Sequence, residues 1–286
     1  MIPFDLVEPH SLSEAIGFLD RDDPAVRPIA GGTALMLMMK AGLFRPLRLV
    51  SLRRIEERYR RIEVETDGAM RIGAMATLAA LERSRTVAEH APVITRTMRR
   101  LANVRVRNVA TVGGNLAHAD PHLDLPPVWI ALGAQAVIVG PGTERELPVE
   151  DLYAGYYETV LQHDEVIAEL IVPSQRGWSA AYLKCTARSA DDWPALGLAA
   201  SLAVNDGTIE EARLALGAAT MIPARLRAAE AELRGARADD ATLRRAAEAA
   251  CEEAAIEGDD RGSAPYKKHL LRVFLARAVT AAMEAR

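Results

Sequence analysis

Thr111-Val112-Gly113-Gly114-Asn115 is the most informative motif of the sequence, with two consecutive glycines between polar side chains. A second glycine pair lies earlier, in Ala30-Gly31-Gly32-Thr33-Ala34. Because glycine has no Cβ, each pair lets the backbone turn sharply and approach a ligand closely. A helix start after the earlier pair would offer unpaired amides, and the later pair forms a possible anion nest. Each pair alone is typical of an ordinary turn, but two in one domain predict a shared pyrophosphate site.

The usual nucleotide-binding and hydrolytic motifs are missing from the 286 residues. The chain has no GxGxxG fingerprint, no GxxxxGKS or GxxxxGKT loop and no GxSxG elbow. A formal net charge of −4 argues against a nucleic-acid partner. The two cysteines, Cys185 and Cys251, exclude a four-cysteine iron–sulfur or zinc site built from this chain alone. They also fit a reducing compartment.

The N-terminus, Met1-Ile2-Pro3-Phe4-Asp5, has neither a basic nor an apolar leader region. No apolar run reaches the roughly 18 residues of a membrane span. We therefore expect a cytoplasmic protein without a membrane span.

Short strands and helices alternate in the first part of the chain. Thr33 is predicted to cap the first helix, and Gly42 to end it. Asp67-Gly68 is typical of a hairpin turn. The stretch 103–124 has no sustained period and predicts an extended functional loop. The predicted strands are 27–30, 48–52, 61–65, 70–74, 136–139 and 165–172, and the predicted helices are 34–41, 78–84, 91–101 and 126–132.

A boundary is predicted near Pro173-Ser174-Gln175-Arg176-Gly177, where the pattern changes to strands followed by helices. That order favours an α+β second domain. Asn205-Asp206-Gly207 predicts a tight turn, and Pro223 and Pro265 each suit the first turn of a helix. We therefore divide the chain into domains 1–175 and 176–286. The later strands are predicted at 179–186, 195–204 and 211–217, and the helices at 223–234, 241–253 and 265–282.

Polar residues gather in His118-Ala119-Asp120-Pro121-His122-Leu123-Asp124. Two histidines and two aspartates resemble a metal site, but Pro121 disfavours the helix that would align the histidines. We predict no metal ligands here and favour a solvated polar loop; hydrogen bonding to a cofactor is the other reading. Arg105 and Arg107 could attract phosphate or pair with acidic groups of a partner.

Longer motifs make the pattern more specific. They are Ile29-Ala30-Gly31-Gly32-Thr33, Arg107-Asn108-Val109-Ala110-Thr111-Val112-Gly113-Gly114-Asn115-Leu116, Ala119-Asp120-Pro121 and Asp124-Leu125-Pro126, with Tyr182-Leu183-Lys184 and Gly262-Ser263-Ala264-Pro265-Tyr266-Lys267 as later landmarks. In this order the chain resembles, from about Phe4 to its end, the FAD-binding medium subunit of molybdenum hydroxylases of the carbon monoxide dehydrogenase and xanthine dehydrogenase type.

The resemblance implies an α+β fold of the vanillyl-alcohol-oxidase (PCMH) type: an FAD-binding domain of two subdomains and a smaller α+β C-terminal domain. It implies noncovalent FAD in an oxidoreductase heterotrimer that can pair into a dimer of heterotrimers. The partners would be a large subunit with a molybdenum cofactor and a small subunit with 2Fe–2S clusters. This chain would be the flavoprotein that passes electrons from those clusters to an external acceptor.

The motif match carries over a set of cofactor-binding residues and no catalytic or metal-binding residue. Ile29, Ala30, Gly31, Gly32, Thr33, Ala34, Leu35 and Met36 would wrap the pyrophosphate, with Thr111, Gly114 and Asn115 completing the site. Asp124 would bond the flavin or ribityl chain, and Leu101, Ala102, Ile167 and Lys184 align with other flavin-contacting positions. A cation at Lys184 would stabilise reduced flavin. Family members often have a polar residue where this chain has Ala34.

An alternative function keeps the same fold but needs no partner: a self-contained FAD-dependent oxidase or reductase. It predicts turnover by the isolated chain. The absence of a candidate substrate base in the motifs argues against it.

Overall fold

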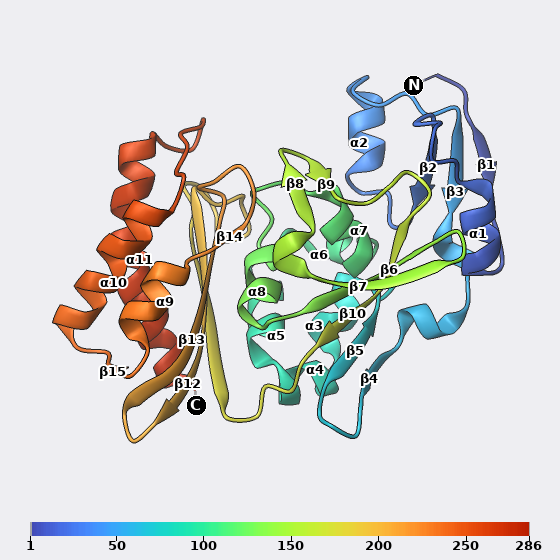
Figure 1. The fold of residues 1–286 in the computed structure, drawn as a ribbon. Coiled ribbons are helices and arrows are strands. Elements are labelled where there is room, and N and C mark those ends of the chain that lie inside the picture. Colours follow the sequence, from blue (N-terminus) through green and yellow to red (C-terminus); the bar gives the residue numbers. More distant parts are fainter. Residues whose placement is uncertain (1, 286) are drawn as a thin grey trace.

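A small parallel sheet begins the chain and forms one end of the molecule (Figure 1). The computed structural model describes residues 2–285. The sheet has the order β1–β3–β2, with all pairs parallel, so each strand is linked to the next through a crossover helix. Its elements are β1 (Asp5–Val7), α1 (Leu12–Phe18), β2 (Val26–Ile29), α2 (Leu35–Lys40) and β3 (Arg48–Ser51).

A five-stranded antiparallel sheet follows, with the order β4–β5–β10–β6–β7. Its central strand β10 is the last in sequence, and the helices between β5 and β6 lie in the chain before it. Two short 3₁₀ turns, Leu52–Arg54 and Glu57–Arg60, lead into the sheet. The strands are β4 (Ile62–Val64), β5 (Met70–Gly73), β6 (Gln135–Gly140), β7 (Thr143–Pro148) and β10 (Val166–Val172), with the hairpin β8 (Tyr153–Gly155) and β9 (Glu158–Thr159) after the turn Val149–Asp151.

Six helices pack on this second sheet and bury the largest core. Trp129, Ile94 and Leu116 have no exposed surface and lie with Ile72 and Leu170 of the sheet. Apolar burial of this kind contributes about 25 cal/mol per Å² of surface removed from water. The helices are α3 (Leu78–Arg83), α4 (Arg85–His90), α5 (Pro92–Met98), α6 (Val104–Arg107), α7 (Val112–His118) and α8 (Leu125–Ala131).

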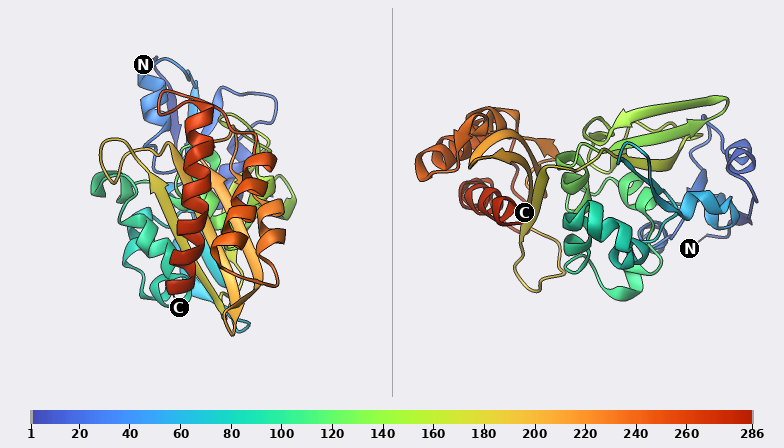
Figure 2. Two further views of the ribbon diagram at one scale, coloured as in Figure 1. Left: turned by 90° about the vertical axis from the view of Figure 1, so that its left-hand side faces the viewer. Right: turned by 90° about the horizontal axis from the view of Figure 1, so that it is seen from below.

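The C-terminal part is an antiparallel sheet covered by helices, and α11 lies along the sheet face turned away from the first part (Figure 2). Its main strands are β11 (Trp178–Cys185), β12 (Leu196–Asn205) and β13 (Thr208–Gly217), with short pairings at β14 (Ala224–Arg225) and β15 (Ala236–Arg237). The helices are α9 (Arg227–Leu233), α10 (Asp240–Glu253) and α11 (Ala264–Glu284). None of the helices within residues 2–285 has the length and hydropathy that crossing a membrane requires.

Both faces of the C-terminal sheet are buried, which explains the long apolar runs of its strands. Ala199 and Ala215 face the core of the first part, where α8 lies on β12 and β13. Leu198 and Leu214 face the opposite way, toward α10 and α11. Alternate residues of a strand point to opposite faces, so a sheet covered on both sides loses the polar–apolar alternation.

Three predictions about the elements are wrong. The extended loop predicted at 103–124 contains α6 and α7, because Asn103 and Thr111 cap short helices that lack a periodic apolar face. Thr33 does not cap α2, whose N-cap is Ala34 without a side-chain bond. Pro223 precedes β14, and the helix begins only at Arg227.

Several turn predictions are confirmed. Gly42 follows α2 with φ +76, and Pro265 lies in the first turn of α11. Asp206 and Gly207 both have positive φ, as the two-residue hairpin between β12 and β13 requires. The sequence did not indicate β1, α1, α4, β7, β8 and the two-residue strands, most of which are too short or too polar for a periodic signal.

Candidate cofactor site

The two glycine segments, residues 30–34 and residues 111–115, lie against each other. A Cβ on Gly31 would overlap the carbonyl oxygen of Val109 and lie 2.9 Å from Ala110 Cα. A Cβ on Gly114 would lie 3.9 Å from Ala30 Cβ. Gly31 therefore permits backbone-to-backbone contact, which joins the small parallel sheet to the helices of the second sheet.

The first glycine segment presents free backbone donors. The amides of Gly32, Thr33 and Ala34 donate to no acceptor among residues 2–285. Gly32 has φ +72, a conformation that side chains with a Cβ rarely adopt. Ile29 through Met36 are all partly exposed, so the free donors are accessible. Adjacent unpaired amides suit the oxygens of a phosphate or pyrophosphate.

The second glycine segment differs, because its amides are already bonded within the protein. Val112 donates to the carbonyl of Ala76 at 3.0 Å, and Gly113 donates to that of Ala74 at 2.8 Å. The amide of Gly114 donates to Thr111 Oγ1 at 3.1 Å. The prediction of an anion nest in this segment is therefore wrong. These bonds fix α7 against the turn after β5.

Asn115 is the one residue of the second segment with an unpaired buried polar atom. Its Oδ1 is buried and has no hydrogen-bond partner among residues 2–285. Leaving a buried polar atom unpaired costs about 1–3 kcal/mol. Such an atom, on the residue after Gly114, whose Cβ position lies near Ala30, is consistent with a site for a polar ligand.

Arg107 holds the turn that contains Leu101 and Ala102. Its guanidinium donates to the two carbonyls at 2.9 and 2.7 Å and pairs with Glu82 at 2.9 Å. Ala102 has φ +47, which this double anchor maintains. Arg107 is thus occupied internally, and the hypothesis that it attracts phosphate or pairs with a partner's acidic groups is wrong. Ile167 is buried, and its carbonyl lies close to Gly113.

Asp124 and Lys184 form a buried ion pair between the two domains. Lys184 Nζ donates to Asp124 Oδ2 at 3.0 Å and to the carbonyl of Asp192 at 2.9 Å. Tyr182 Oη donates to Asp124 Oδ1 at 2.7 Å. Burial raises the pKa of Asp124, and the contacts with Lys184 and Tyr182 oppose that rise. An ammonium has three donors, so one N–H of Lys184 remains for another acceptor.

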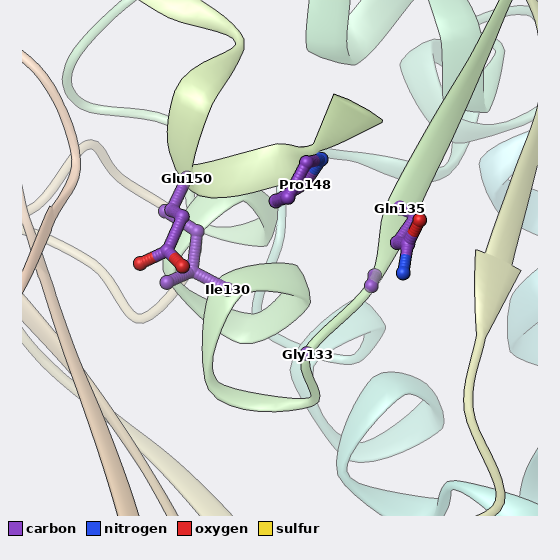
Figure 3. A pocket seen from close by; sticks show the side chains of 6 residues that line it. Ile130, Gly133, Gln135, Pro148 and Glu150 are labelled. Carbon is purple, nitrogen blue, oxygen red and sulfur yellow. The ribbon is translucent and has the colours of Figure 1, made fainter. Parts of the chain in front are cut away.

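A cavity of about 230 Å³ lies beside this pair, between α5, β11 and the end of α11. Tyr182 and Lys184 line it, together with Arg96 on α5 and Arg100 in the turn after α5. No ion pair occupies either arginine within residues 2–285. A second cavity, about 160 Å³, is lined by Ile130, Gly133 and Glu150 among others and contains none of the predicted cofactor residues (Figure 3).

The polar loop 118–124 is not solvated, contrary to the favoured prediction. Asp120 is 1% exposed and His122 is 8% exposed. Asp120 bonds to His122 and Tyr157, and His122 bonds to Asp259 of the C-terminal domain, a long-range contact that local sequence does not reveal. Within residues 2–285, no group of three or more His, Cys, Asp or Glu side chains could hold a metal ion.

Tyr182 is a further residue of the site: it was predicted only as part of a family motif, and its contact with Asp124 was not predicted. The available signal was spacing: Tyr182 and Lys184 are two apart on one strand, so they face the same side. Both side chains therefore meet the same carboxylate.

Two family models match the chain. One, described as the FAD binding domain in molybdopterin dehydrogenase, matches residues 2–175. The other, the CO dehydrogenase flavoprotein C-terminal domain, matches residues 181–282. The carbon monoxide dehydrogenase medium chain of Hydrogenophaga pseudoflava is 32% identical over 287 residues, covering 99% of this chain and 98% of that one. The xanthine dehydrogenase FAD-binding subunit of Escherichia coli O157:H7 is 28% identical, covering 99% and 98%.

Solved structures agree over the whole length. Carbon monoxide dehydrogenase from H. pseudoflava, in a form lacking the Mo-pyranopterin moiety, matches with TM-score 0.95 and 33% identity, covering 100% of this chain and 99% of that chain. Quinoline 2-oxidoreductase from Pseudomonas putida 86 matches with TM-score 0.91 and 30% identity, covering 99% and 98%. The mixed α/β architecture, an FAD-binding domain followed by a C-terminal domain, is thus the one expected. The chain belongs to the FAD-binding flavoprotein subunits of the molybdopterin dehydrogenases, a family of oxidoreductases.

Proposed function

We propose that this chain holds FAD noncovalently across its two glycine segments and passes electrons from 2Fe–2S clusters of a partner subunit to an external acceptor. The observation that carries the cofactor site is the row of free amides at Gly32, Thr33 and Ala34, in a segment that packs against the one bearing the buried, unpaired Oδ1 of Asn115. Bound FAD supplies an electron acceptor that takes up electrons singly or in pairs.

The first glycine segment would hold the pyrophosphate. The amides of Gly32, Thr33 and Ala34 supply donors, and the Thr33 hydroxyl adds another. Because these donors come from the backbone, Ala34 contributes without a polar side chain. Ile29, Leu35 and Met36 would supply apolar contacts around the donors. The departure of Ala34 from the family pattern therefore does not remove the anion site.

The second segment would play a mainly positional part. Thr111 and Gly114 hold the first turn of α7, and Asn115 Oδ1 is free to accept a hydroxyl of the ribityl chain or ribose. Lys184 and Asp124 lie at the junction of the two domains. Lys184 would donate its third N–H to the flavin, and Asp124 would bond the flavin or the ribityl chain. Leu101, Ala102 and Ile167 complete the proposed set of cofactor-binding residues. Arg107 holds the turn of Leu101 and Ala102, and Gly113 lies against the carbonyl of Ile167.

The subunit assembly that we propose is based on the family to which the chain belongs. Relatives are described as medium chains, so we propose partners that carry the molybdenum cofactor and the clusters in a heterotrimer, with pairing into a dimer of heterotrimers. Cys185 and Cys251 are separate within this chain, which fits clusters held elsewhere. A cytoplasmic location and a domain boundary at residues 175/176 belong to the same proposal.

The test begins with the purified full chain. We expect a yellow protein that releases FAD on denaturation, and a colourless chain that fails to bind added FAD would contradict the site. With the cluster subunit added, rapid mixing should show cluster reoxidation matched by flavin reduction. Turnover of a reductant by the isolated chain would instead support the self-contained oxidase or reductase.

A further inference from the structure

The loop between α7 and α8, with the start of α8, contacts the C-terminal domain. The amide of Ala218, at the end of β13, donates to the carbonyl of Pro121 at 2.8 Å. A Cβ on Gly217 would lie 3.1 Å from Pro127 Cγ. Ala119 and Ala218 both have positive φ, +53 and +63, at this contact. Strained backbone on both sides of one junction indicates that the contact is tightly constrained.

His122 lies in this loop between carboxylates of the two domains. Its Nδ1 is 3.1 Å from Asp120 Oδ1, and its Nε2 is 2.9 Å from Asp259 Oδ2. A carboxylate only accepts, and a neutral imidazole donates through one nitrogen alone. Both contacts are hydrogen bonds only when both ring nitrogens carry protons. The geometry therefore requires an imidazolium.

Each carboxylate has further partners. Tyr157 Oη donates to Asp120 Oδ2 at 2.7 Å, and His118 Nε2 lies 3.9 Å from the same oxygen. Lys267 Nζ, from α11, donates to Asp259 Oδ2 and to the carbonyl of Ala218, both at 2.7 Å. Asp259 thus keeps a cation whatever the state of His122. Among the residues that the structure describes, His122 is the one cation hydrogen-bonded to Asp120.

The open ring faces are also occupied. Trp193 stacks on His122 with ring centroids 5.7 Å apart and planes at 7°. The guanidinium of Arg261 lies over the Trp193 ring, 5.3 Å from its centroid, and pairs with Asp260. His122 therefore orders three separate segments: its own loop, the loop that carries Trp193, and the turn 259–262.

The charges agree with this geometry. Burial alone would lower the pKa of His122, but its bonds to Asp120 and Asp259 raise it above the ordinary value, against a smaller opposing effect of Arg261. Burial would raise the pKa of Asp259, yet the bonds from His122 and Lys267 lower it to about 2. Burial lowers the pKa of His118, so that neighbouring ring favours the neutral form.

We propose that protonated His122 is a clasp between the domains: it bridges Asp120 and Asp259, and loss of its proton releases the C-terminal domain from the 119–123 loop. Neutral His122 keeps one bond and turns a lone pair toward the other carboxylate. Because the folded pKa is raised, the clasp is complete below the ordinary histidine value of about 6.5 and is lost as pH rises through the raised pKa.

The direct test follows the ring nitrogens of His122 by NMR in the full chain labelled at histidine, with the His122→Gln variant identifying its signals. We expect both nitrogens to stay protonated above the pH at which an unperturbed histidine titrates. Asp259→Asn should move the midpoint to lower pH, whereas the neighbouring Asp260→Asn should leave it nearly unchanged. A midpoint at or below the ordinary value, or one that ignores Asp259→Asn, would overturn the proposal.

Domain release has its own readout. The protection factor of the Ala218 amide, which relates its exchange rate to the intrinsic rate at the same pH, should fall by about tenfold or more as His122 deprotonates, since one charge-assisted bond is lost. In His122→Gln the protection factor should be low at every pH. A protection factor that stays constant in wild type across the NMR midpoint would contradict the clasp.

A measurement of FAD release rests on the proposed function and distinguishes a failure of that function from a failure of the clasp. If FAD occupies the proposed site, its release should speed up over the same pH range in wild type and not in His122→Gln. A chain that binds no FAD would refute the proposed function while the NMR and exchange tests still decide the clasp.

Discussion

The two glycine segments look alike in sequence but differ in how their backbone is used. The first leaves the amides of Gly32, Thr33 and Ala34 unpaired, whereas the second bonds those of Val112, Gly113 and Gly114 inside the protein. One segment is available for a ligand, and the other builds the wall beside it. A pair of glycines therefore indicates close approach to the backbone, but it does not indicate whether a ligand or another part of the protein makes the contact.

The largest expected effect is on folding, from the glycine at which the two segments touch. Gly31→Ala places a Cβ on the backbone of Val109, which cannot move aside as a side chain would. We expect a loss of about 3 kcal/mol or more in the free energy of unfolding, at the upper end of overpacking costs. Urea titration of the full chain measures it.

The control for Gly31→Ala is Gly17→Ala in α1, where a Cβ would meet nothing within 4 Å. That change should leave stability equal or slightly higher, because alanine favours helix. If both variants unfold at the same urea concentration, the two segments do not touch as described.

The next largest effect is on cofactor affinity. Gly32→Ala, at φ +72, should cost about 1–2 kcal/mol of stability through backbone strain. It should also disturb the free amides and weaken FAD binding by about tenfold or more, since bonds to charged groups contribute about 1.5–3 kcal/mol. Fluorescence titration with FAD gives the dissociation constant.

Gly142→Ala provides the matched strain control, because Gly142 has φ +66 and open space around it. It should lose similar stability and keep full FAD affinity. Equal affinity losses in the two variants would mean that the first segment has no special part in binding.

A smaller effect is expected at Asn115. Asn115→Ala removes a buried, unpaired oxygen, so the cofactor-free chain should be no less stable. FAD affinity should fall by a few-fold to about tenfold, the range for one neutral hydrogen bond. The exposed Asn205→Ala is the control in the same titration. Unchanged affinity in Asn115→Ala would remove this residue from the site.

The smallest effect on affinity is expected at Thr111. Thr111→Val removes the cap of α7 and should cost about 1 kcal/mol of stability. Ser11→Ala, which removes the cap of α1, should cost a similar amount. FAD affinity should change little in either variant. A large loss confined to Thr111→Val would show that its hydroxyl binds the cofactor and that the two segments share the task.

Much of the fold was predictable from local patterns. The turns at Gly42 and Asp206-Gly207 were predictable because positive φ favours glycine and aspartate strongly. The helices α6 and α7 were missed because they are short and held by side-chain caps rather than by a periodic apolar face. The boundary between domains at 175/176 stays a prediction.

For the candidate site, the motifs located the segments but not their bonding. Arg107 and Arg105 looked alike in sequence, yet Arg107 is fixed by Glu82 and by two carbonyls from the turn before it. The prediction of a solvated loop at 118–124 is wrong because His122 bonds to Asp259, which is held in turn by Lys267. Both residues lie more than a hundred positions away in sequence.

Residue type and local spacing were enough to indicate the family, most of the longer helices and strands, and the two places where a backbone approaches closely. The free amides, the paired charges and the position of His122 between two domains became visible only in the folded chain. Hydrogen-bond satisfaction and burial depend on partners distant along the chain, and a single sequence carries no record of them.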